Sequence, residues 1–165
     1  MALDKDMSRF RKLLRGLVKD AAGEAVMREV GEQAVKVIQQ RTKIGKDQDD
    51  RPFKKVSDQY EKRRRKVTLD PRATRTKNKS NLIASGQMID SIEVTDVKPR
   101  SVEISAKGGR SKTPLGGNRN NAEVAYYVEK AGRKFLGMSE KSREKLAKFY
   151  QRIVSKLVRK ANRKR

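Results

Sequence analysis

The chain contains no cysteine and no histidine among its 165 residues, and this excludes several kinds of chemistry. Without cysteine there is no disulfide framework and no thiolate nucleophile, and without histidine the commonest zinc ligand and general base are missing. Ser85 has no histidine to activate it and lies outside any G-x-S-x-G context. The sequence therefore predicts a protein that is not an enzyme and that has no metal and no cofactor.

Apolar residues are also scarce, because 35% of the residues are hydrophobic, 5% are aromatic and 38% are charged. No apolar run approaches the ~20 residues that span a bilayer, and the first ten residues lack the apolar core of a secretory signal. We expect a cytoplasmic protein without membrane contact. The length is typical of one domain, and the composition predicts a small core with long polar loops.

Acidic residues are few: 20 Asp and Glu stand against 43 Lys and Arg, a net charge of +23. Such a charge repels itself unless a polyanion or an acidic protein surface lies nearby. The candidate contacts with DNA or a protein partner are Lys62, Arg63, Arg64, Arg65, Lys66, Arg110, Lys112, Arg119, Arg163, Lys164 and Arg165. For the dense cluster at 62–66, a solvated helix end and a phosphate contact both remain open. Tyr60 is the only aromatic residue near it, so base stacking has little support.

A β-hairpin is predicted at the centre of the chain, within 81–106. Ile92 and Val94 alternate with polar residues and are answered by Val102 and Ile104 across a turn at 98–101. The polar face carries Glu93, Thr95, Glu103 and Ser105. Because a lone hairpin is marginally stable, we expect helices or further strands to cover its apolar face. Residues 134–136 are expected to add an edge strand.

Amphipathic helices are predicted at both ends, where apolar residues recur at steps of three and four. The N-terminal stripe is Phe10, Leu13, Leu14, Leu17, Val18, Ala22, Ala25, Val26, Val30, Ala34, Val37 and Ile38. One helix and two helices that meet near Asp20 both fit, because Gly16, Gly23 and Gly31 each weaken a helix by up to about 1 kcal/mol. Gly45 ends it. The C-terminal stripe, after an N-cap at Ser139, is Leu146, Phe149, Tyr150, Ile153, Val154, Leu157 and Val158.

The fold class that follows is α+β in a single domain, 1–165. The predicted parts are an N-terminal helix or helix pair at 1–44, a basic loop or arm at 45–80, a sheet-forming region at 81–138 with a mobile loop at 107–121, and a C-terminal helix with a basic tail at 139–165. Within these parts, Ser57 is expected to cap a short helix that carries Tyr60. Residues 69–80 are expected to form an exposed loop or arm, and 122–130 fits a helix better than a strand.

Two further features bear on possible chemistry. Glu129 sits in an apolar stretch, where burial raises a carboxyl pKa or requires a cation, and a structural ion pair with Arg133 is the preferred interpretation. The glycine-rich loop matches neither phosphate-binding spacing, so a loop that becomes ordered on a partner is preferred there.

Three segments, taken together and in this order, resemble a known family. They are RPFKKVSDQYEKRRRKV, NLIASGQMIDSI and VAYYVEKAGRKFLGMSE. The arrangement is similar to the virion-morphogenesis and tail-completion proteins of tailed bacteriophages, the Mu-like and related neck proteins. The matching positions are Pro52, Phe53, Ser57, Tyr60, Leu82, Ser85, Gly86, Met88, Ser91, Ile92, Tyr127, Glu129, Gly132, Arg133, Phe135, Leu136, Gly137 and Ser139. This sequence departs from the family in three places: Lys134 replaces the usual proline, the loop before Ala122 is longer and more basic, and the arm at 69–80 is extra.

The resemblance implies a structural protein of the virion. In that family, copies form a ring around the DNA channel and contact other neck, connector or tail-tube proteins. Nonspecific contact with packaged DNA would suit the positive charge. The alternative is a sequence-nonspecific nucleic-acid-binding protein that acts through its basic arms.

Overall fold

The computed structural model describes residues 15–16, 18–77, 79–109 and 117–163. Its helices are α2 (Glu24–Lys43), α3 (Asp58–Arg64), α4 (Gln87–Asp90), α5 (Asn121–Lys130) and α6 (Glu140–Asn162), and its strands are β1 (Ile92–Lys98) and β2 (Ser101–Ala106). The fold is α+β, as predicted from the sequence. The predictions for Phe10, Leu13, Leu14, Leu17, Arg110, Lys112, Lys164 and Arg165 lie outside the described residues.

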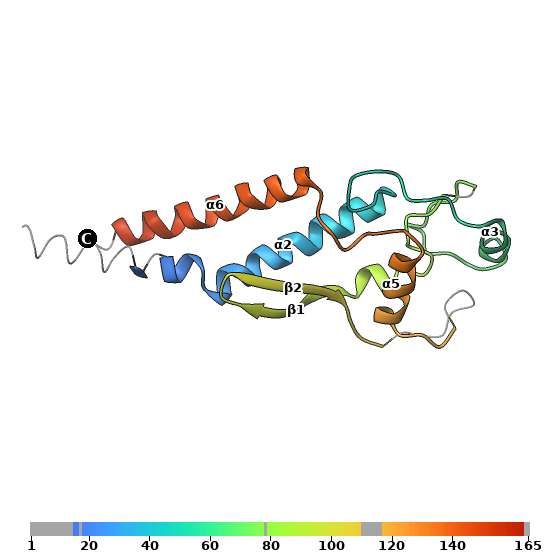
Figure 1. Cartoon of the computed structure of the whole chain (residues 1–165), viewed down its shortest axis with the longest axis horizontal. Helices are drawn as coiled ribbons and strands as arrows, with labels where there is room; N and C mark the ends of the chain where they lie inside the picture. The colour runs from blue at the N-terminus through green and yellow to red at the C-terminus, as the bar shows by residue number, and fades with distance from the viewer. Residues whose placement is uncertain (1–14, 17, 78, 110–116, 164–165) are drawn as a thin grey trace, which may run out of the picture.

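Helix α2 forms the centre of an elongated molecule (Figure 1). It packs against both strands on one side and against α6 on the other. Helices α3, α4 and α5 gather at the opposite end from the hairpin turn, with the long loops. The molecule thus has a narrow end of two helices and a hairpin, and a broad end that holds most of the irregular chain.

The hairpin has the predicted pairing, with Val94 opposite Ile104 and Lys98 opposite Ser101. A β-bulge between Val94 and Asp96 adds one residue to β1. A bulge changes which face the following side chains occupy. Val97, which strict alternation would place on the polar face, therefore pairs with Val102 and extends the apolar face toward α2.

Gly31 allows α2 to lie close to this apolar face. A Cβ atom at position 31 would stand 2.6 Å from the Cγ2 atom of Val102 and 2.8 Å from that of Val94. Both side chains are β-branched and stiff at χ1, so neither moves aside easily. The glycine that weakens the helix in the sequence is the residue that permits helix–sheet packing.

We expect Gly31→Ala to lower the free energy of unfolding by about 1–3 kcal/mol, the usual effect of overpacking, although alanine favours a helix by up to about 1 kcal/mol. Gly16→Ala is the matched control, because a Cβ atom there meets nothing within 4 Å. Urea denaturation of both variants measures the difference. Equal stability of the two variants would show that the α2–hairpin packing has room to spare.

Both ends of α2 agree with the sequence. The chain turns at Ala22 and Gly23, so the two-helix alternative is the correct one in the described region. At the other end Gly45 has a φ of 78°, and its amide donates to Thr42 O while that of Lys46 donates to Arg41 O. This is a Schellman motif, which requires a residue with positive φ at this position.

The core lies at the junction of α2, the hairpin and the broad end. Its buried residues are Ile38, Phe53, Ile83, Met88, Ile89, Ile92, Ala106, Ala125 and Phe135. The edge strand predicted at 134–136 is wrong, because the sheet has two strands. The amides of Phe135 and Leu136 instead donate to the Glu129 carboxylate, at 3.1 and 3.0 Å, and Phe135 O accepts from Arg41. Side chains therefore occupy the hydrogen-bonding groups that a strand would use.

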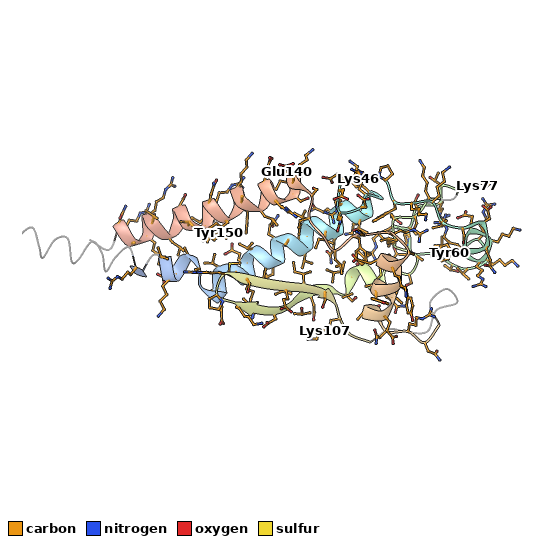
Figure 2. The ribbon with its side chains drawn as sticks, viewed as in Figure 1. Lys46, Tyr60, Lys77, Lys107, Glu140 and Tyr150 are labelled. Carbon is orange, nitrogen blue, oxygen red and sulfur yellow. The ribbon has the colours of Figure 1, made fainter. Side chains whose placement is uncertain are left out.

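Helix α6 begins at its predicted cap, since Ser139 Oγ accepts from the Ser142 amide at 3.2 Å. Its apolar stripe is less buried than expected. Among the stripe residues only Ile153 is buried, and Val158 is 37% exposed. The Tyr150 hydroxyl donates to Ala21 O at 3.2 Å (Figure 2 labels Tyr150). Helix α2 covers one side of α6, and the rest of the stripe is partly open.

Candidate functional site

A groove of about 680 Å³ opens at the broad end of the molecule. Its walls come from three segments distant in sequence: residues 54–60, residues 80–88 and residues 119–133, which include α5. Tyr60, labelled in Figure 2, lies in one wall. The apolar lining includes Val56, Leu82, Met88, Val124 and Val128. The volume is within the range of sites that hold a ligand or a short peptide segment.

Four cations line the groove, and none of its lining residues is acidic. These cations are Lys54, Lys55, Arg119 and Arg133. The guanidinium of Arg133 donates to Lys54 O at 3.2 Å and to Lys55 O at 2.9 Å, which are neutral acceptors. Burial lowers the pKa of Arg133, the expected effect of moving a cation out of water. Arg119, a predicted partner contact, lies 4.7 Å above the Tyr127 ring centroid at this groove.

Local sequence signals position each wall of the groove. Ser57 caps α3 as predicted, because its Oγ accepts from the Tyr60 amide. Asn120 and Glu123 form a capping box at the start of α5, which confirms the helix favoured for 122–130. Gly86, with a φ of 73°, begins α4 and gives room to the Asp70 carboxylate, whose Oδ2 would be 2.6 Å from a Cβ there.

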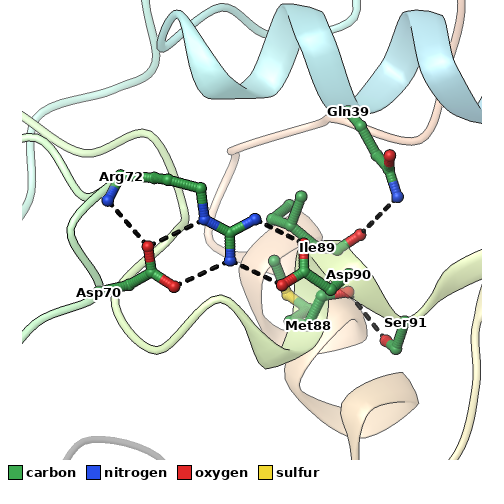
Figure 3. Close-up of polar contacts among 7 residues, drawn as sticks. All are labelled: Gln39, Asp70, Arg72, Met88, Ile89, Asp90 and Ser91. Atoms are coloured by element: carbon green, nitrogen blue, oxygen red, sulfur yellow. Dashed lines mark hydrogen bonds and ion pairs between the residues drawn. The ribbon is translucent and has the colours of Figure 1, made fainter.

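The segment 69–80 is a loop, as predicted, but it is not a free arm. Arg72 donates to both Asp70 and Asp90, so one guanidinium ties the loop to α4 (Figure 3). Asn81 donates to Lys43 O and Arg72 O, and it accepts from the Thr74 amide. This clamp was not predicted from the sequence, because Arg72 and Asp90 are 18 residues apart and form no local pattern.

This clamp makes stability depend on pH in acid. Hydrogen bonds from Arg72 lower the pKa of Asp70 from 3.8 to about 2, and they also lower that of Asp90. A carboxyl whose pKa is depressed on folding adds stability above its unfolded pKa and loses it as the pH falls through the folded value. We therefore expect the free energy of unfolding to fall between about pH 4 and pH 2, and to fall less in Asp70→Asn. Identical pH profiles from acid-dependent urea titrations would contradict the clamp.

One of the five cations in the cluster at 62–66 is unavailable to a partner. Arg64 is 4% exposed, forms an ion pair with Glu61 at 2.8 Å and donates to the carbonyls of Lys79 and Thr76. Its inclusion among the contact residues is therefore wrong. Lys62, Arg63 and Lys66 are exposed, and Arg65 is exposed but paired with Glu61 at 3.2 Å. The cluster thus offers fewer free charges than its sequence suggests.

A longer cationic surface lies on α6, and Arg163 is its only member that was predicted as a contact residue. Its seven exposed members are Lys141, Lys145, Lys148, Arg152, Lys156, Arg159 and Arg163. They follow one another at steps of three or four, so they share one face of the helix. At 1.5 Å per residue this α6 stripe is about 33 Å long. No acidic residue occurs between Lys145 and Arg163. The helical spacing of Lys and Arg was the signal available in the sequence.

Glu129 has a structural role different from the one predicted. Its carboxylate binds the backbone amides of Phe135 and Leu136, whereas Arg133 binds carbonyls. The predicted Glu129–Arg133 ion pair is absent from the described part of the chain. Glu129 thus binds the backbone that follows the turn at Gly132, where φ is 79°, and Arg133 binds the backbone of residues 54–55.

The segments that carry the family resemblance converge in space. Phe53, Met88 and Phe135, one from each segment, belong to the same core. Arg133 joins the third segment to the first through the carbonyls of Lys54 and Lys55. The groove has lining residues from all three segments. The matching positions are therefore parts of one structural unit, the core and walls of the broad end.

Comparison of the chain with known protein families, with curated proteins and with solved structures finds no match in any of the three. Among the described residues, no three acidic side chains are gathered in a way that would hold a metal ion. None of the described helices has both the length and the apolar character needed to cross a bilayer.

Proposed function

We propose that this chain is a structural assembly protein of a tailed-phage neck. It joins the DNA-filled head to the tail, or completes the upper end of the tail, as one copy in a ring around the DNA channel. Its neighbours are other copies of itself and the connector, neck or tail-tube proteins. It is made in the host cytoplasm and ends in the virion.

The observation that carries this proposal is the convergence of the three resembling segments. Their shared positions have physical roles that a family fold would need: Phe53 and Phe135 fill the core, Ser57 and Ser139 cap helices, and Glu129 binds backbone amides. The convergence supports a shared architecture.

Surface features add support for contact with neighbours. Val18, Ile44, Tyr126, Tyr127 and Val158 are large apolar or aromatic side chains with high exposure. Within the described part of the chain, α6 packs mainly against α2, and most of its apolar stripe is only half-buried. Apolar surface that one copy leaves open is buried when copies associate in a closed ring.

Removal of the gene from the phage genome that encodes it tests the proposal. Electron microscopy of the resulting lysate should show DNA-filled heads and separate tails, and expression of the chain in trans should restore joined particles. Joined, infectious particles in the absence of the chain would contradict the proposal.

A sequence-nonspecific nucleic-acid-binding protein is the second candidate, and the α6 stripe is the observation that favours it. Seven cations in line can each neutralise a phosphate and release a counterion. The two functions differ in how strongly the isolated chain should bind nucleic acid. A dedicated binder shows tight, salt-sensitive and length-dependent affinity as a monomer, whereas a neck protein needs only weak contact with DNA.

A further inference from the structure

We infer that the groove between residues 54–60, residues 80–88 and α5 is a docking site for a peptide segment of a neighbouring protein. This segment carries acidic side chains together with aliphatic side chains such as leucine. The inference deepens the proposed function and rests on it for the identity of the neighbour. The chemistry of the occupant follows from the groove alone.

Apolar side chains on the groove wall require an apolar counterpart. Val56, Leu82, Met88, Val124 and Val128 come from all three walls, so an inserted aliphatic side chain would be surrounded. Contact of this kind removes apolar surface from water on both partners. A polyphosphate backbone has no group that would use these side chains, which favours a peptide over nucleic acid.

The positive charge at the groove favours a partner with negative charge. Lys54, Lys55, Arg119 and Arg133 line it without any acidic residue. Arg133 is held in place by two carbonyls, so its position is fixed before a partner arrives while its charge is not neutralised by them. A carboxylate from a partner would pair with a preorganised cation, and such charge-assisted hydrogen bonds are the strong ones.

Two adjacent tyrosines provide an internal comparison. Tyr126 and Tyr127 are 62% and 49% exposed and contact each other edge to face at 5.5 Å, but only Tyr127 lines the groove. Both carry a nearby cation, Lys130 over Tyr126 and Arg119 over Tyr127. A substitution at each position therefore removes a similar side chain from a similar setting, inside and outside the proposed site.

The test is fluorescence anisotropy with the full chain and three short labelled peptides. The first alternates Glu and Leu, the second replaces each Leu by Ser, and the third replaces each Glu by Lys. We expect the first peptide to bind at least about tenfold more tightly than the other two, because both the charge and the apolar side chains contribute. Equal binding of the Glu-Leu and Glu-Ser peptides would show attraction by net charge only and would overturn the inference.

Variants of equal charge locate the binding. The double variant Lys54→Glu, Lys55→Glu should bind the Glu-Leu peptide at least about tenfold more weakly than the double variant Lys77→Glu, Lys79→Glu. The second variant changes exposed lysines outside the groove. Tyr127→Ala should weaken it by several fold, and Tyr126→Ala should not. Equal losses within each pair would place the binding elsewhere.

Hydrogen exchange gives a readout that does not need a variant. The Glu-Leu peptide should slow exchange at residues 80–88 and in α5, and a duplex DNA competitor should leave this protection unchanged. Displacement of the peptide from these segments by the duplex would mean that the groove binds nucleic acid, and it would overturn the inference. Failure of any of these tests leaves head–tail joining unaffected, so the two proposals fail separately.

Discussion

Phe135→Ala is expected to lower the free energy of unfolding by about 3–5 kcal/mol, the usual result of deleting a fully buried aromatic ring. The ring has no exposed surface and lies in the one core that joins α2, the hairpin and the broad end. The surrounding backbone is fixed by Arg41 and Glu129, so the cavity has little freedom to collapse. The free energy of unfolding of a whole domain is roughly 5–15 kcal/mol. The loss from this single substitution therefore approaches the entire stability of a domain at the lower end of that range.

Urea denaturation at neutral pH measures this loss, and Phe149→Ala is the control. Phe149 belongs to the half-open stripe of α6, so its removal should have a much smaller effect. If both variants lose similar amounts of stability, the chain is held together as much by α6 as by the core at the broad end.

Charge reversal of four α6 stripe residues is expected to have the largest effect on DNA affinity. The variant is Lys145→Glu, Lys148→Glu, Arg152→Glu and Lys156→Glu. If each cation neutralises one phosphate, the slope of log affinity against log salt falls by about three to four. Circular dichroism checks that α6 remains helical, because the changed residues are exposed and do not contribute to the core.

The matched variant is Lys62→Glu, Arg63→Glu, Arg65→Glu and Lys66→Glu, which has the same change in net charge. These residues lie within little more than about one helical turn of chain, and Arg65 already contacts Glu61, so they reach fewer phosphates than the α6 stripe. Filter binding over a range of salt concentrations should show the smaller loss of slope here. A larger loss for this cluster would make it the principal polyanion surface.

Features that depend on neighbours in sequence were predictable. The hairpin alternation, the Ser57 and Ser139 caps and the helix end at Gly45 each need only a few adjacent residues, and all agree with the structure. The bulge in β1 and the close approach at Gly31 were not predictable, because they depend on how the hairpin meets a helix that is distant in sequence.

Polar side chains that bind segments distant in sequence account for most of the remaining differences. Arg41 reaches the carbonyls of Phe135 and Gly137, more than 90 residues away, and Arg72 joins Asp70 to Asp90. Such contacts leave no periodic pattern in a sequence with so many cations. The same abundance hid the α6 stripe, because its cations are spaced along a helix and do not form a dense run in the sequence.

Reconstruction of purified, joined phage particles by electron cryomicroscopy tests the central proposal most directly. The account predicts a closed ring of density at the head–tail junction into which copies of this fold fit, with α2 between α6 and the hairpin. Particles that contain the chain at another location, or joined particles that lack it, would contradict its assignment as a neck protein.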